Sequence, residues 1–109
     1  FYKRELGPLE GVKIMPENEW DKPNYWLSCI LLNGKVKPFD IIQALEKENI
    51  ESRPIWKPMH TQPFYKDCDF IGTGTSEDIF NNGVCLPSDT NMTYDDLERI
   101  TSTIKGLWN

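Results

Sequence analysis

The order of apolar and polar positions along the chain predicts three strands. The clearest is the run YWLSCILL at residues 25–32, which is almost wholly apolar, aromatic or β-branched and ends at the turn signal Asn33-Gly34. Because this run lacks a clean alternation, we expect both of its faces to be covered, which places it centrally in a sheet. Two shorter strands are predicted at residues 50–55 and 84–87, and Pro87 ends the second one.

Helices are predicted where apolar residues recur at helical spacing between start and stop signals. The segment at residues 38–49 begins with Pro38 and can end at Asn49, and its apolar stripe comprises Phe39, Ile41, Ile42 and Leu45. A short helix is predicted at residues 75–82, opened by a capping hydroxyl and by acids in its first turn. Thr93 caps the last helix, whose buried face comprises Leu97, Ile100, Ile104 and Leu107.

The remaining segments decide how these elements are arranged. Phe1, Tyr2 and Leu6 share one face of a short helix that Gly7-Pro8 stops, so we expect a piece of a larger protein, cut on its N-terminal side. Residues 9–24 are linker-like, and only residues 12–15 could extend. The alternation of strands and helices predicts an α+β fold, a three-stranded sheet covered mainly on one side by helices. Strand direction stays open at this point.

The stretch ESRPIWKPMHTQPFY at residues 51–65 organises the chain. Its three prolines exclude a helix interior or a central strand, so it is predicted to be an extended, semi-rigid surface loop. The loop carries Arg53, Trp56, Tyr65 and the only histidine, His60. Rigid loops rich in such side chains form recognition surfaces. The alternative, equally open from composition, is that the rings pack on a small core while the charges are solvated.

Composition and charge narrow the function classes. The net charge is −5 and no predicted element carries a cluster of lysine and arginine, which argues against nucleic-acid binding. No apolar run approaches the roughly 20 residues that a membrane-spanning helix needs. The three cysteines are far apart and only one histidine is present, so they predict no zinc site, and a reducing, cytoplasmic setting fits best. Cys29 and Cys85 lie in apolar runs and are expected to be small buried hydrophobes.

No complete catalytic constellation follows from the residues alone. His60 is the only neutral-pH base, and local spacing brings no serine or cysteine to it. The stretch at residues 72–76 resembles a phosphate loop but lacks its lysine and glycine spacing, so a helix cap is favoured. Asp95 and Asp96 point about 100° apart on a helix and are better interpreted as partners of its dipole. Lys57 is expected to be a solvated loop lysine.

Five segments in order carry a family resemblance: YWLSCILL, LEKENI, ESRPIWKPMHTQPFY, GVCLPSD and MTYDDLERITSTIKGLW. They closely resemble the C-terminal small domain of the DegT family of nucleotide-sugar aminotransferases, fold-type I pyridoxal-phosphate enzymes. The family's helix end I-x-[ST]-R falls on Ile50, Ser52 and Arg53, and its strand ending LP falls on Leu86-Pro87. Its loop motif P-x-H-x-Q-P-x-[YF] falls on Pro58, His60, Gln62, Pro63 and Tyr65. The resemblance covers essentially all 109 residues.

The resemblance implies both an organisation and an activity. Residues 1–8 would end a connecting helix from a missing large domain, and residues 9–109 would form the C-terminal small α+β domain. The intact protein would be a cytoplasmic homodimer that moves an amino group from glutamate to a keto nucleotide-sugar, for polysaccharide or glycan sugar biosynthesis. Its pyridoxal 5′-phosphate would be held by a lysine of the large domain, and the carbanion chemistry would belong to that cofactor.

The resemblance also assigns site residues. Arg53 and His60 would contact the sugar or diphosphate of the substrate, and Trp56 and Tyr65 would be wall or stacking residues. No residue of this chain is expected to be catalytic, to hold the cofactor or to bind a metal, so the fragment alone is predicted to be inactive. Two alternatives stay open: a stand-alone α+β module that binds a small ligand or a protein, and the branch of the family that dehydrates sugars.

Overall fold

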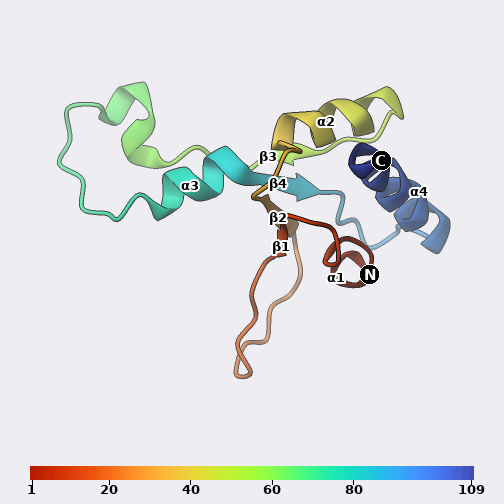
Figure 1. Cartoon of the computed structure of the whole chain (residues 1–109). Helices are drawn as coiled ribbons and strands as arrows, with labels where there is room; N and C mark the ends of the chain where they lie inside the picture. The colour runs from red at the N-terminus through yellow and green to blue at the C-terminus, as the bar shows by residue number, and fades with distance from the viewer.

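The computed structural model describes all residues from 1 to 109 (Figure 1). In chain order its elements are α1 (Tyr2–Leu6), β1 (Val12–Ile14), β2 (Ser28–Leu32), α2 (Pro38–Lys47), β3 (Arg53–Pro54), α3 (Thr75–Asn82), β4 (Gly83–Leu86) and α4 (Tyr94–Lys105). Single 3₁₀ turns lie at Met59–Thr61, Pro63–Tyr65 and Gly106–Trp108. The predicted α+β class is confirmed.

The strands form one sheet in the order β1-β2-β4-β3, in which every neighbouring pair is antiparallel. The prediction of three strands is wrong, because a fourth strand lies within the segment that was expected to be a linker. Val12 pairs with Leu32 and Ile14 with Ile30, so β1 covers the outer edge of β2. Both β1 side chains also pack against the core, which explains why so short a segment extends.

The two faces of the sheet have different roles, because side chains alternate along each strand. Ile30 and Val84 lie opposite each other and face the core. The helices contribute the other half of that core with Leu6, Ile41, Leu45, Ile100 and Ile104, all of them buried. The opposite face carries a row in which Cys29 of β2 lies across from Cys85 of β4, and Cys85 across from Arg53 of β3. The packed helices therefore cover mainly one face, as predicted.

The strand predicted at residues 25–32 is shorter and less buried in the structure than expected. Pairing begins at Ser28, and Tyr25 takes a left-handed φ of 52° that interrupts any extended run. Trp26 is 73% exposed, so the apolar character of residues 25–27 belongs to a surface and not to a core. Cys29 and Leu31 are only half-buried, which corrects the expectation of two covered faces and of a fully buried Cys29. The strand predicted at residues 50–55 is likewise reduced to Arg53–Pro54.

The predicted helices are present, with two local corrections. Asn49 takes the left-handed φ of 57° expected at the end of α2, but Phe39 is 64% exposed and lies outside the buried stripe. The N-cap of α3 is Gly74 at a φ of 83°, and no side chain caps that end, so the capping hydroxyl predicted there is absent. Thr93 caps α4 as predicted, since its hydroxyl accepts the amide hydrogen of Asp96.

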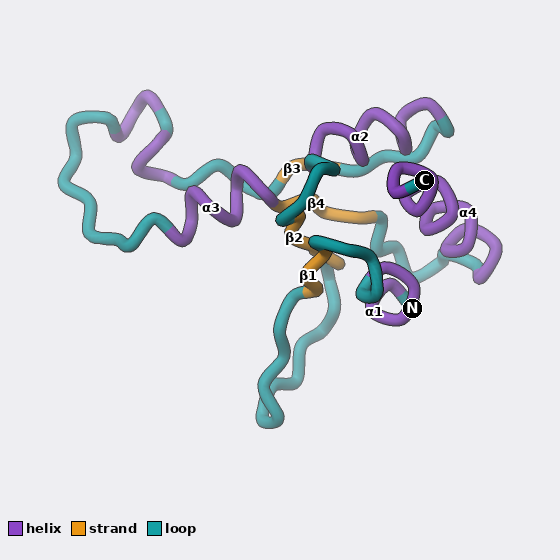
Figure 2. The backbone as a smooth tube through the Cα atoms, viewed as in Figure 1, coloured by secondary structure: helices purple, strands orange, loops and turns teal.

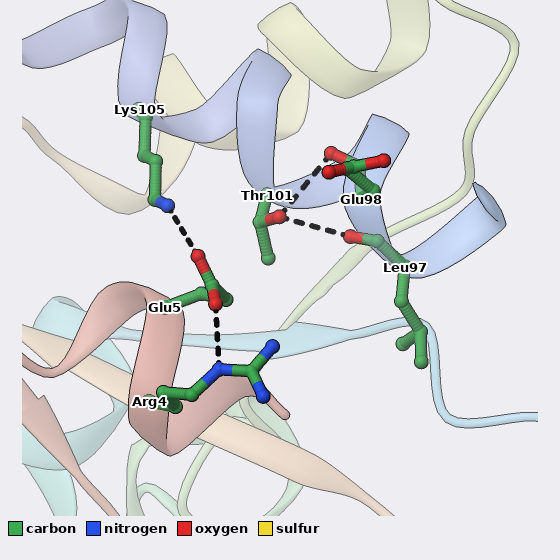
Figure 3. Close-up of polar contacts among 6 residues, drawn as sticks. All are labelled: Arg4, Glu5, Leu97, Glu98, Thr101 and Lys105. Atoms are coloured by element: carbon green, nitrogen blue, oxygen red, sulfur yellow. Dashed lines mark hydrogen bonds and ion pairs between the residues drawn. The ribbon is translucent and has the colours of Figure 1, made fainter. Parts of the chain in front are cut away.

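The first and last helices are joined by polar contacts between α1 and α4 (Figure 3). The carboxylate of Glu5 accepts hydrogen bonds from Arg4 Nε at 2.7 Å and from Lys105 Nζ at 2.6 Å. On the same helix, the Thr101 hydroxyl is buried and donates to the carbonyl oxygens of Leu97 and Glu98. The contact between Lys105 and Glu5 is the one that holds α1 against α4, although 100 residues separate the two in sequence.

Two long loops extend away from the body of the fold (Figure 2). The first arm, residues 15–27, joins β1 to β2, and the second arm, residues 55–74, joins β3 to α3. Most of the exposed large apolar side chains lie on these arms, including Trp20 at 80%, Phe64 at 86% and Ile71 at 100%. The second arm contains most of the loop predicted at residues 51–65. None of the helices has both the length and the apolar composition needed to cross a membrane.

Candidate functional site

A hollow with a volume of about 650 Å³ lies beside the β3 edge of the sheet. We call it the sheet-edge hollow. Four segments line it: residues 26–27 at the end of the first arm, residues 51–57 around β3, Phe80 of α3 and residues 85–88 after the centre of β4. These segments are far apart in sequence, and the antiparallel pairing of β2, β4 and β3 brings them together.

Arg53 stands at this hollow because β3 is a very short edge strand, with Arg53 opposite Cys85. Pro54 ends the pairing, since proline has no amide hydrogen to donate. The Arg53 guanidinium donates to Glu51 Oε1 from Nε at 2.8 Å and from Nη2 at 2.6 Å. Both side chains are about three-quarters exposed. The planar, forked guanidinium of Arg53 is therefore held at the surface by the Glu51 carboxylate, which an anionic ligand could replace.

Exposed indole rings accompany Arg53. Trp56 is 66% exposed and Trp26 is 73% exposed, and both line the sheet-edge hollow. Prolines at positions 54 and 58 stiffen the chain on either side of Trp56, which lowers the entropy lost when a ligand orders this segment. Flat apolar faces beside a cationic fork suit a ligand that combines a ring with phosphate.

His60 lies outside the hollow, on the second arm. Its ring stacks on Phe70, with centroids 3.5 Å apart and planes inclined by 13°. Its Nε2 lies 2.6 Å from Glu77 Oε1 of α3, and the imidazole must be the donor because an ionised carboxylate can only accept. This hydrogen bond is the main reason why the pKa of Glu77 lies below its usual range. His60 therefore ties the two ends of the second arm together.

Tyr65 also lies outside the sheet-edge hollow. It is half-buried on the second 3₁₀ turn of the arm, where Phe64 packs edge-on at 5.0 Å between ring centroids. Of the four residues that the sequence assigned to substrate, Arg53 and Trp56 meet at the hollow, whereas His60 and Tyr65 lie together on the arm.

The sequence assigned no role to three residues that line the hollow. Trp26 was placed in a buried strand, and no local signal separates it from the strand that follows. Glu51 could have been recognised, because residues two apart on an extended chain share a side and its charge is opposite to that of Arg53. Ser52 has a buried hydroxyl oxygen that lacks a hydrogen-bond partner, which makes it an unused donor at the wall of the hollow.

The lining of the hollow does not fit pyridoxal phosphate. That cofactor takes a lysine for its aldehyde carbon and an acidic partner for its ring nitrogen. One lysine, Lys57, and one carboxylate, Glu51, line the hollow, and Glu51 is already paired with Arg53. The N-terminus of α3, whose amides could bind a phosphate, is outside the lining. We also find no group of three metal-ligating side chains.

Residues 1–105 match the DegT/DnrJ/EryC1/StrS aminotransferase family. The chain therefore belongs to this family, whose members are pyridoxal-phosphate-dependent aminotransferases. The family resemblance inferred from the sequence is confirmed.

Two relatives match nearly the whole of this chain but only part of their own length. EpsN of Bacillus subtilis (strain 168), provisionally named a pyridoxal phosphate-dependent aminotransferase, is 44% identical over 112 residues, which cover 99% of this chain and 29% of EpsN. GDP-perosamine synthase of Vibrio cholerae is 30% identical over 112 residues, which cover 100% of this chain and 30% of that protein. The chain thus spans less than a third of the length of these relatives.

Solved structures support the fold. The sugar aminotransferase CalS13 of Micromonospora echinospora superposes with a TM-score of 0.82 at 18% identity, over 98% of this chain and 28% of that one. PseC of Helicobacter pylori, an aminotransferase involved in pseudoaminic acid biosynthesis, gives 0.81 at 19% identity, over 96% of this chain and 29% of that one. At such identities the likeness concerns architecture alone, and it confirms the α+β fold.

Proposed function

We propose that this chain is the C-terminal small domain of an aminotransferase that moves an amino group from glutamate to a keto nucleotide-sugar. The observation that carries the proposal is the Arg53 fork at the sheet-edge hollow, beside two exposed indole rings. A nucleotide-sugar offers a diphosphate for the fork and flat rings for the indoles. In this proposal residues 1–8 end a connecting helix and residues 9–109 form the small domain.

Arg53 and Trp56 have the more direct proposed roles. Arg53 exchanges Glu51 for a substrate phosphate, which replaces one charge-assisted pair with another and costs little desolvation. Trp56 provides a wall for the sugar or base. His60 and Tyr65 contact the same substrate from the second arm, and the hydrogen bond to Glu77 fixes the imidazole before the substrate arrives.

The cofactor is proposed to lie outside this chain, in the remaining part of the protein. The lining of the hollow supports this, because it offers neither a free carboxylate nor a phosphate cradle. The exposed rings of the arms that lie outside the hollow, such as Trp20 and Phe64, are proposed to pack on that remaining part, since large apolar side chains on a surface mark an interface. The homodimer comes from the family resemblance, and the three free thiols fit the cytoplasmic setting inferred from the sequence.

The test is a product analysis with the full-length protein and its cofactor. Glutamate and a keto nucleotide-sugar should give an amino nucleotide-sugar and 2-oxoglutarate in equal amounts. A deoxy keto-sugar that has gained no nitrogen, formed while the amino group of glutamate is released as ammonia, would place the protein in the dehydrating branch of the family instead. Binding of a nucleotide-sugar by the isolated chain, without turnover in the full-length protein, would favour a stand-alone binding module.

A further inference from the structure

Two thiols lie directly across the centre of the sheet. Cys29 of β2 and Cys85 of β4 are partners in the antiparallel register, and their Sγ atoms are 3.6 Å apart. They belong to the face that the core helices leave open, in the same row as Arg53. Cys68, the third cysteine, is exposed on the second arm and takes no part in this pair.

The register brings the two cysteines within bonding range. Directly opposed residues in an antiparallel pair have Cα atoms about 4.5 to 5.5 Å apart, and disulfides are found at Cα separations of about 4.4 to 6.8 Å. A disulfide needs the sulfur atoms, which are 3.6 Å apart, to approach to about 2.05 Å. The strand register therefore keeps the two thiols close enough to form a disulfide.

The two thiols differ in how readily they react. Cys29 is half-buried, whereas Cys85 is buried and 6% exposed. Burial, followed by the hydrogen bond with Cys29, raises the pKa of Cys85 to about 12. Because the thiolate is the nucleophile towards oxidants, Cys29 is the thiol that reacts first and Cys85 is the thiol that closes the bond.

We propose that Cys29 and Cys85 form a reversible modification site, a cross-strand disulfide produced by a hydroperoxide. The Cys29 thiolate attacks the peroxide O–O bond and becomes a sulfenic acid, and an alcohol or water leaves. The Cys85 sulfur then attacks the Cys29 sulfur, the S–S bond forms, and the sulfenic oxygen leaves as water. Two thiols and one peroxide thus yield one disulfide, one water and one alcohol or second water, and an external dithiol reverses the step.

Peptide mapping of the full-length holoprotein tests this proposal. Cys68→Ser serves as the background, so that the exposed thiol cannot form bonds between molecules. After hydrogen peroxide treatment and digestion, we expect a linked peptide containing Cys29 and Cys85, and a parallel loss of iodoacetamide labelling at both positions. Dithiothreitol should restore both labels.

Two controls make the result specific. In Cys29→Ser, the linked peptide should disappear while Cys85 keeps its labelling, because the first reactive thiol is gone. In protein unfolded by urea before peroxide is added, the yield of the linked peptide should fall, because the strand register no longer holds the two thiols together. The proposal is overturned if folded protein oxidises at Cys29 without linkage to Cys85, or if neither thiol reacts.

Discussion

The imidazole of His60 donates from Nε2 to Glu77 Oε1 at 2.6 Å while its ring stacks on Phe70. His60 stands at the start of the second arm, and Glu77 stands in the first turn of α3, where the arm ends. A loop of this length would lose much conformational entropy on ordering, and this contact shortens its free part. The histidine that the sequence assigned to substrate therefore also anchors the arm.

We expect Glu77→Gln to make thermal stability depend less on pH in the acidic range. The hydrogen bond from His60 lowers the pKa of Glu77, so its contribution is present above the ordinary carboxyl pKa and is lost as pH falls through the lowered value. The variant should be less stable than wild type near neutral pH, and the gap should close in acid. Thermal unfolding from about pH 7 to pH 3 measures it. A gap of constant size would contradict the assignment, and Glu98→Gln on α4 is the control.

Arg53→Ala should weaken use of the nucleotide-sugar. Loss of one charge-assisted contact should raise its apparent KM by ~10- to 150-fold, while the KM for glutamate stays unchanged. Stability should hardly change, because an exposed pair such as Arg53–Glu51 contributes little to folding. Steady-state kinetics with both substrates, beside thermal unfolding, are the measurements.

Glu51→Gln changes the other residue of the Arg53–Glu51 ion pair and serves as the comparison for Arg53→Ala. It keeps the side-chain shape but removes the carboxylate that competes for the guanidinium. We expect the KM for the nucleotide-sugar not to rise, in contrast to the increase expected for Arg53→Ala. An increase as large as that of Arg53→Ala would mean that the ion pair itself, and not a free Arg53, shapes the site.

Thr93→Ala should destabilise α4. Its hydroxyl accepts the Asp96 amide hydrogen and also lies 2.7 Å from Asp96 Oδ2, to which it can donate, and the Thr93 amide donates to the same oxygen at 2.8 Å. The bonds to Oδ2, first from the hydroxyl and then from the amide, lower the pKa of Asp96. Loss of an N-cap costs ~1 kcal/mol of unfolding free energy. Urea unfolding of Thr93→Ala and Thr93→Ser measures the difference, since serine keeps the hydroxyl. Equal loss in both variants would point to methyl packing instead of the cap.

Tyr2→Phe should remove a link between α1 and the strand that borders the hollow. The Tyr2 hydroxyl donates to the Pro87 carbonyl at 2.8 Å, and its loss should cost ~1 kcal/mol. Burial raises the pKa of Tyr2 to about 12, so its contribution is present below the ordinary value near 10 and is lost as pH rises through 12.

The alkaline unfolding curve of Tyr2→Phe should therefore be flatter than that of wild type in this window. Exposed Tyr94→Phe, which should follow wild type, is the control. Identical slopes for wild type and Tyr2→Phe would show that Tyr2 ionises equally well in the folded protein.

Local sequence was sufficient to predict those features of the fold that neighbouring residues cause. The end of α2 at Asn49, the Thr93 cap and the stripe around Ile100 and Ile104 were predicted because caps and helical spacing act within one or two turns. The family followed from the loop motif, since a chain of residue types at fixed spacing is itself a sequence property. The same reasoning predicted Arg53 and Trp56 on one recognition loop, and the structure brings both residues to the sheet-edge hollow, Arg53 from strand β3.

Only the tertiary structure determined the strand pairs and side-chain contacts that join residues distant in sequence. β1 extends only because β2 has a free edge, and the apolar run at residues 25–27 is a surface because Tyr25 turns the chain before pairing begins. The hollow, the contact of His60 with Glu77 and the facing of Cys29 and Cys85 all come from strand register and loop closure. The sequence by itself determined the elements and the family, and pairing across the chain determined which residues meet, because periodicity carries no information about non-local register.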